Sequence, residues 1–95
     1  MKIKNIEYLD KSRNECFLTL VNKDAELVCF SDMKEFSCGE EINIPLETLS
    51  VNNVVICNDE TEMILKKGDH SYNIIGRLIN KVEGIIITKS FLMRL

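Results

Sequence analysis

The stretch that decides the fold is ECFLTLV at 15–21, followed by NKD at 22–24 and AELVCF at 25–30. Both outer pieces are rich in apolar, β-branched and aromatic residues, which strands favour. Asn and Asp in the polar piece between them favour a turn. The pattern therefore predicts an antiparallel hairpin over 15–30.

Other segments of the same character lie on both sides of this hairpin, at residues 3–9, 54–57, 62–66, 72–80 and 84–95. The apolar residues change parity near Asn5, which predicts a bulge in the first segment. Gly76 lies inside a predicted strand, which indicates a bulge or sharp bend there. We expect no more than short helical turns at 32–36 and 45–50.

This number of short strands predicts an all-β fold with one or two short helical turns. A chain of 95 residues has the length of one domain, so we expect a single β-barrel domain over residues 1–95. Closing the sheet removes exposed strand edges, which a small open sheet would leave. We therefore expect a Greek-key barrel of five to seven strands.

Three pieces of sequence carry a resemblance to a known family. They are FSCGEEI at 36–42, YNIIGR at 72–77 and a last strand that includes Phe91. In strand order and glycine placement, the chain resembles the small stand-alone OB-fold-like domains of bacteria. The resemblance implies a five-stranded Greek-key barrel that binds single-stranded nucleic acid through its second and third strands.

The cysteines give no sign of a metal site. Cys16, Cys29, Cys38 and Cys57 are separated by 13, 9 and 19 positions, and zinc sites use much closer pairs. We therefore predict no metal and no other cofactor. No apolar run is long enough to span a bilayer, and residues 1–7 lack the apolar core of a signal peptide. We expect a cytoplasmic protein with reduced thiols and no membrane partner.

The only histidine, His70, lies between Asp69 and Ser71. A catalytic triad is assembled from distant positions on a scaffold, whereas neighbours on one turn point in different directions. The glycines form no phosphate-binding motif. We predict no catalytic residue and no enzymatic activity.

Charge is distributed unevenly along the chain. Residues 1–23 have net charge +2, residues 24–62 have −9 and residues 63–95 have +4. An acidic surface of this kind favours a cationic partner through complementary potential. We therefore predict a protein-binding module, of the immunity or inhibitor type, for a partner protein with a basic surface. The predicted binding residues are Glu26, Asp32, Glu35, Glu40, Glu41 and Glu47.

Two alternatives stay open. The first is a single-stranded nucleic-acid-binding protein that uses a basic surface from the terminal strands, because phosphate is repelled by the acidic middle. Most aromatic side chains are expected in the core rather than on a stacking platform. The second is a subunit whose apolar strand at 85–87 pairs with another copy, so we expect a monomer or a homodimer. The basic surface of the first alternative, the nucleic-acid-binding protein, comprises Lys2, Lys4, Lys66, Lys67, Arg77 and Lys81.

Overall fold

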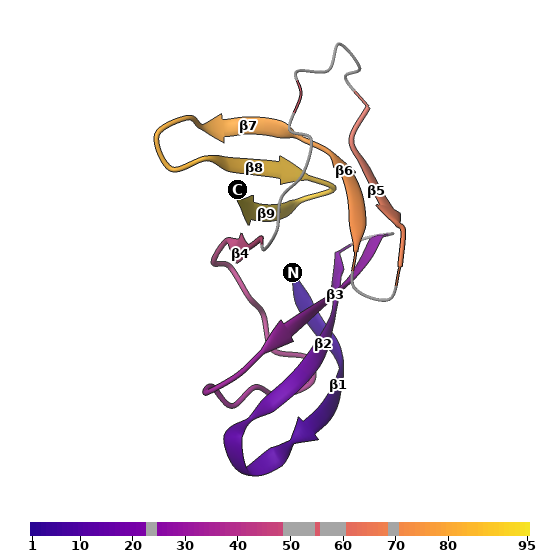
Figure 1. Cartoon of the computed structure of the whole chain (residues 1–95), viewed down its shortest axis with the longest axis vertical. Coiled ribbons are helices and arrows are strands. Elements are labelled where there is room, and N and C mark those ends of the chain that lie inside the picture. The colour runs from indigo at the N-terminus through magenta and orange to yellow at the C-terminus, as the bar shows by residue number, and fades with distance from the viewer. Residues whose placement is uncertain (23–24, 49–54, 56–60, 69–70) are drawn as a thin grey trace. The chain divides into compact units, whose positions relative to one another are not determined.

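A computed structural model of the chain describes residues 1–22, 25–48, 55, 61–68 and 71–95. Apart from one short 3-10 helix, its regular structure is β-strand (Figure 1). The predicted all-β fold is confirmed. The expected barrel is not closed, because the strands of the described residues form three separate sheets.

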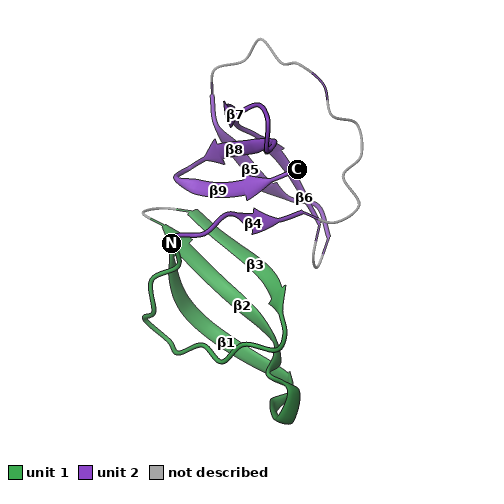
Figure 2. Ribbon diagram, turned by 90° about the vertical axis from the view of Figure 1, so that its left-hand side faces the viewer, with its two compact units in different colours: residues 1–42 green, residues 43–95 purple. Residues whose placement is uncertain are grey.

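The chain divides into two compact units, Met1–Ile42 and Asn43–Leu95, which Figure 2 shows in different colours. We call them unit 1 and unit 2. Unit 1 contains the hairpin that was expected from the sequence, and unit 2 contains the C-terminal strands. A single domain over residues 1–95 stays a prediction.

Unit 1 is built on a three-stranded antiparallel sheet of β1 (Lys2–Asp10), β2 (Glu15–Asn22) and β3 (Ala25–Ser31). The predicted hairpin is therefore confirmed. The register of β1 shifts between Ile3 and Asn5, where a bulge was predicted.

The 3-10 helix η1 (Lys11–Arg13) joins β1 to β2. At its start, the carboxylate of Asp10 accepts a hydrogen bond of 3.1 Å from the backbone N–H of Ser12. At its end, Asn14 adopts a left-handed conformation, which Asn tolerates better than most residues. These two local features reverse the chain between the strands.

The two faces of the unit 1 sheet differ in burial. Cys16, Leu18 and Leu20 alternate along β2 and are almost fully buried. Ile3 and Leu27 are paired with Leu20 on the neighbouring strands, so their side chains join the same face. This face is the core of unit 1. We call the opposite face the outer face.

The free edge of β1 is covered near its start by the segment Gly39–Ile42. Ile3 donates to the carbonyl of Glu40 at 2.9 Å, and Ile42 donates to the carbonyl of Met1 at 2.7 Å. Gly39 has φ of +86°, a conformation that side chains rarely adopt. The turn at Gly39 thus brings the segment back along an edge that would otherwise be open to pairing.

Unit 2 contains a four-stranded sheet in the order β4-β9-β8-β7 and a two-stranded sheet of β5 and β6. β8 is an inner strand of the four-stranded sheet. The strands are β4 (Leu46–Glu47), β5 (Met63–Lys66), β6 (Tyr72–Ile75), β7 (Arg77–Asn80), β8 (Ile85–Thr88) and β9 (Phe91–Arg94).

Gly76 separates β6 from β7 and lets one extended segment pass from the two-stranded to the four-stranded sheet. The predicted bend is therefore present at this glycine. Thr88, fully buried on β8, donates a hydrogen bond of 2.8 Å from its hydroxyl to the carbonyl of Ile75 on β6. This bond links the two sheets of unit 2 where the chain bends.

Three local predictions need correction. The strand expected at 84–95 is divided into β8 and β9, because Lys89 and Ser90 have φ of 48° and 66° and form a tight turn. No helical turn forms at 32–36, and β4 occupies part of 45–50 in place of a helical turn. The strand expected at 54–57 lies outside the described residues, apart from Val55.

Candidate functional site

The outer face of unit 1 carries a row of three paired side chains. Glu7 on β1 lies opposite Phe17 on β2, and Phe17 lies opposite Phe30 on β3. The two rings meet edge to face, with centroids 6.0 Å apart and an interplanar angle of 69°. Phe30 is 53% exposed, so this aromatic pair lies at the surface of the protein.

An open hollow of about 490 Å³ lies where β2 begins and the chain leaves β3. Its lining includes Arg13, Glu15, Asp32 and Met33. Met33 is 87% exposed and has φ of 65°, which is unusual for a residue with a long side chain. Its backbone N–H donates to the carbonyl of Arg13 at 3.1 Å, and this bond fixes the position of Met33 beside the hollow.

The cations of unit 1 interact mostly within the unit. Lys4 forms an ion pair with Glu26, and Arg13 lies 4.0 Å from Asp10 and 3.8 Å from Glu15. Two lysines lie over aromatic rings instead. The ammonium of Lys11 is 5.6 Å from the ring centre of Tyr8, and that of Lys34 is 4.9 Å from the ring centre of Phe36.

Three carboxylates of unit 1 are left without such compensation. Among the described residues, no cation pairs with Glu7, Asp32 or Glu35, and all three are exposed. By sequence, unit 1 contains nine acids and six bases, whereas unit 2 contains six of each. The excess negative charge of the chain therefore belongs to unit 1.

The other predicted acidic residues have partners inside the chain. Glu26 pairs with Lys4, as described above. Glu40 accepts a hydrogen bond of 3.2 Å from the backbone N–H of Ser37, and Glu41 lies 3.8 Å from the N-terminal amine of Met1. These three side chains help to hold unit 1 together. Asp32 and Glu35 are the members of the set in unit 1 that pair with no group among the described residues.

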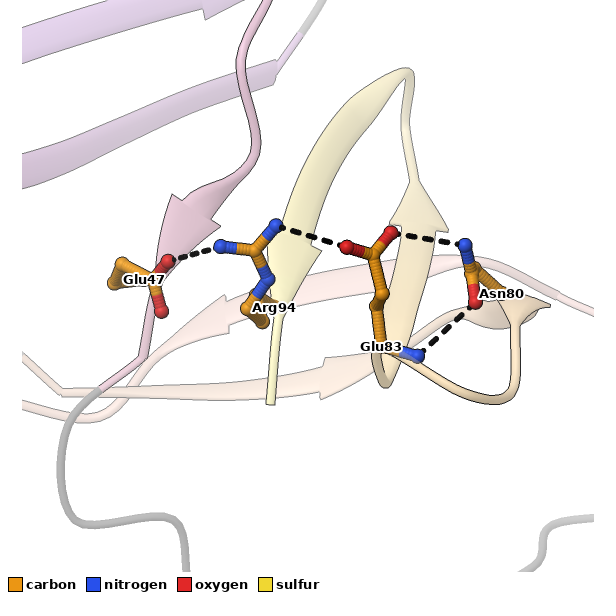
Figure 3. Close-up of polar contacts among 4 residues, drawn as sticks. All are labelled: Glu47, Asn80, Glu83 and Arg94. Atoms are coloured by element: carbon orange, nitrogen blue, oxygen red, sulfur yellow. Dashed lines mark hydrogen bonds and ion pairs between the residues drawn. The ribbon is translucent and has the colours of Figure 1, made fainter.

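Glu47 belongs to unit 2, whereas the five other predicted acidic residues belong to unit 1. Its carboxylate accepts a hydrogen bond of 2.6 Å from Arg94, which also lies 3.9 Å from Glu83 (Figure 3). Glu83 in turn accepts a hydrogen bond of 3.0 Å from the side-chain amide of Asn80. This chain of contacts joins β4, β9 and the turn after β7, so Glu47 has a structural partner.

The predicted basic residues are also divided between the units. Lys2 and Lys4 lie on β1, and the other four lie in unit 2. Lys66 on β5 is paired with Tyr72 at the start of β6, whereas Arg77 follows the end of β6. The two residues are therefore separated by the length of β6, about 10 Å at 3.3 Å per residue. Among the described residues no acid pairs with Lys66, Lys67, Arg77 or Lys81. They lie at the end of β5, at the start of β7 and directly after each of these two strands.

The expectation that most aromatic residues are in the core is wrong. Of the six aromatic side chains, Phe91 alone is fully buried, whereas Tyr8 and Phe30 are exposed. The sequence alone did not reveal the outer face, because β2 carries apolar residues at both odd and even positions and so does not show which face is buried. The signal that would have revealed it is the hairpin register, which places Phe17 opposite Phe30 once the turn is centred on 23–24.

The described thiols have different environments. Cys16 is buried, and burial raises the pKa of its thiol. Burial also raises the pKa of Cys29 to about 11, with a smaller contribution from Cys16. Cys38 is exposed. Cys57 and His70 lie outside the described residues.

The part of the chain that the structure describes holds no group of three or more His, Cys, Asp or Glu side chains placed to bind a metal ion. It also contains no helix that is long and apolar enough to cross a membrane. No family model matches the chain, and neither a curated protein nor a solved structure is found to be similar to it. The resemblance to OB-fold-like domains therefore stays a prediction.

Proposed function

We propose that the protein is a non-catalytic binding module whose unit 1 contacts a basic surface of a partner protein. The observation that carries the proposal is the state of the charges in unit 1. Its described cations are mostly occupied by carboxylates or aromatic rings, whereas Glu7, Asp32 and Glu35 have no cation among the described residues. A surface with uncompensated carboxylates attracts and orients a cationic protein.

The apolar side chains beside these carboxylates support a protein as the partner. Phe30 and Met33 are exposed next to Asp32, and aromatic residues and methionine are enriched in protein–protein interfaces. A cytoplasmic inhibitor of the immunity type, which covers the cationic site of another protein, would need this combination of carboxylates and apolar anchors.

Charge reversal tests the proposal in the full chain. The tagged protein is purified from its native host with and without nuclease, as the wild type, as Asp32→Lys with Glu35→Lys, and as Lys66→Glu with Lys67→Glu. We expect a basic protein to co-purify with the wild type even after nuclease treatment. It should no longer co-purify with the first variant, and it should still co-purify with the second. Equal loss with both variants, or recovery of nucleic acid alone, would contradict the proposal.

The nucleic-acid alternative has one observation in its favour: no acid among the described residues pairs with Lys66, Lys67, Arg77 or Lys81 of unit 2. It predicts that single-stranded oligonucleotides bind at about 50 mM salt and that binding weakens steeply as salt is added. Fluorescence polarisation measures this directly. Binding that is lost with Lys66→Glu and Lys67→Glu would favour the alternative over a basic protein partner.

A further inference from the structure

The aromatic pair on the outer face is placed differently from Tyr8 and Phe36, the other aromatic residues of unit 1. Tyr8 and Phe36 each have a lysine of the chain over the ring. The rings of Phe30 and Phe17 meet edge to face. Among the described residues, no cation lies over the ring of Phe30. Because Phe30 is 53% exposed and meets Phe17 edge to face rather than stacked on it, the ring of Phe30 still offers a face to a ligand.

Carboxylates surround this pair on the same face of the sheet. Glu7 lies directly opposite Phe17. Glu15 precedes Phe17 by two residues, and Asp32 follows Phe30 by two residues. Side chains two residues apart on a strand project from the same face, so Glu15 lies on the face of Phe17. Asp32 directly follows the end of β3 and lines one hollow together with Glu15. Glu7 therefore places a carboxylate beside the ring of Phe17, and Asp32 lies two residues after Phe30 in the chain.

An aromatic face beside carboxylates is complementary to a planar cation. A guanidinium group stacks on an aromatic ring and donates parallel hydrogen bonds to a carboxylate, whereas an ammonium group is a compact charge that is more strongly hydrated. The open hollow that Glu15 and Asp32 line is reached directly from solvent.

We infer that the outer face of unit 1 binds an arginine side chain of the partner protein, with the guanidinium on Phe30 and its N–H groups directed at Asp32. This inference rests on the proposed function and specifies the group that the acidic surface recognises. Arg13 contacts Asp10 and Glu15, so the chain already uses guanidinium–carboxylate pairing at the margin of the hollow. Asp32 is the carboxylate there that lacks a cation in the part of the chain that the structure describes.

The test is a nuclear magnetic resonance titration of the full chain with the peptide acetyl-Gly-Arg-Gly-amide. Two further peptides replace arginine by lysine or by citrulline, which keeps the shape but loses the charge. We expect the ring resonances of Phe17 and Phe30 to shift with the arginine peptide, less with the lysine peptide and hardly at all with the citrulline peptide. Equal shifts with arginine and citrulline would overturn the inference.

Substitutions locate the binding site. Phe30→Leu is expected to weaken binding of the arginine peptide by about 2- to 30-fold, the range of a cation–π contact. Phe36→Leu is the matched control, because Lys34 already occupies that ring, and we expect no change. Asp32→Asn, which keeps the side-chain volume, should weaken binding and preserve the spectrum of the folded protein. Unchanged binding by both Phe30→Leu and Asp32→Asn would also overturn the inference.

The proposed function and this inference fail in different ways. If the arginine peptide does not bind but the basic partner is still lost with Asp32→Lys and Glu35→Lys, the inference is wrong and the proposed function stands. If the peptide binds at Phe30 but no basic partner depends on the acidic side chains, the proposed function is wrong.

Discussion

A Cβ atom placed on Gly76 would lie 2.9 Å from the carbonyl oxygen of Ile87. It would also lie 3.2 Å from the side chains of Ile86 and Thr88. The glycine is thus required by the close approach of β8 to the point where the chain passes from β6 to β7.

Replacing this glycine should therefore destabilise the protein. We expect Gly76→Ala to lower the free energy of unfolding by about 1–3 kcal/mol, because backbone must shift to relieve the contact. Gly68→Ala is the control, since the nearest atom to its added Cβ is 3.9 Å away, and we expect a change within about 0.5 kcal/mol. Urea denaturation measures both. Similar losses for the two variants would contradict this account of the bend.

The hydroxyl of Thr88 should contribute to the same junction. Thr88→Val removes the donor to Ile75 with little change in side-chain shape, and leaves a carbonyl without that bond. We expect a loss of about 1–2 kcal/mol in the free energy of unfolding. Thr19→Val on the outer face is the control, because no hydrogen bond of that hydroxyl occurs among the described residues, and it should be neutral within about 0.5 kcal/mol. A neutral Thr88→Val would show that the link between the sheets is not stabilising.

Glu47 and Asp32 should differ in their effect on partner binding although both were expected in one acidic surface. Glu47→Gln breaks the contact with Arg94 in unit 2, an exposed pair that is worth about 0–1 kcal/mol of stability. We expect this variant to bind the basic partner as the wild type does, whereas Asp32→Asn binds more weakly. Calorimetric titration with the purified partner gives both affinities. Weaker binding by Glu47→Gln than by Asp32→Asn would place the interface elsewhere.

A substitution of Met33, which has a left-handed backbone conformation, should affect the stability of the fold and the binding of the partner in different ways. A non-glycine residue in this conformation costs about 1–2 kcal/mol, whereas glycine adopts it readily. We therefore expect Met33→Gly to keep or raise the free energy of unfolding while it weakens partner binding. Thermal unfolding and the binding titration test the two halves. A loss of stability above about 1 kcal/mol would mean that the methionine side chain supports the fold.

The sequence predicted the strands of unit 1 well because the local signals there are strong. The polar segment between 21 and 25 and the parity change near Asn5 are properties of short stretches, and both features are present. The turn at Lys89 and Ser90 was missed because neither residue favours positive φ, so the pairing of β8 with β9 must impose it. Local composition does not reveal a turn that tertiary pairing dictates.

The candidate site was predicted only in part. Asp32 and Glu35 follow from charge along the chain, and the structure leaves both unpaired among the described residues. Glu40, Glu41 and Glu47 carry the same charge but have partners in the fold, which charge counting does not detect. Glu7 and the aromatic pair were missed because they come together only through the strand register.

Site-specific photo-crosslinking tests the central claim most directly. A photoreactive phenylalanine derivative is placed at Met33 in unit 1 or, as a control, at Val82 in unit 2, because these side chains are 87% and 96% exposed. In cells of the native host, position 33 should crosslink to a basic protein, and Asp32→Asn with Glu35→Gln should abolish the crosslink. Crosslinks to that protein from position 82 alone, or to nucleic acid alone from either position, would contradict the claim that unit 1 binds a basic partner protein.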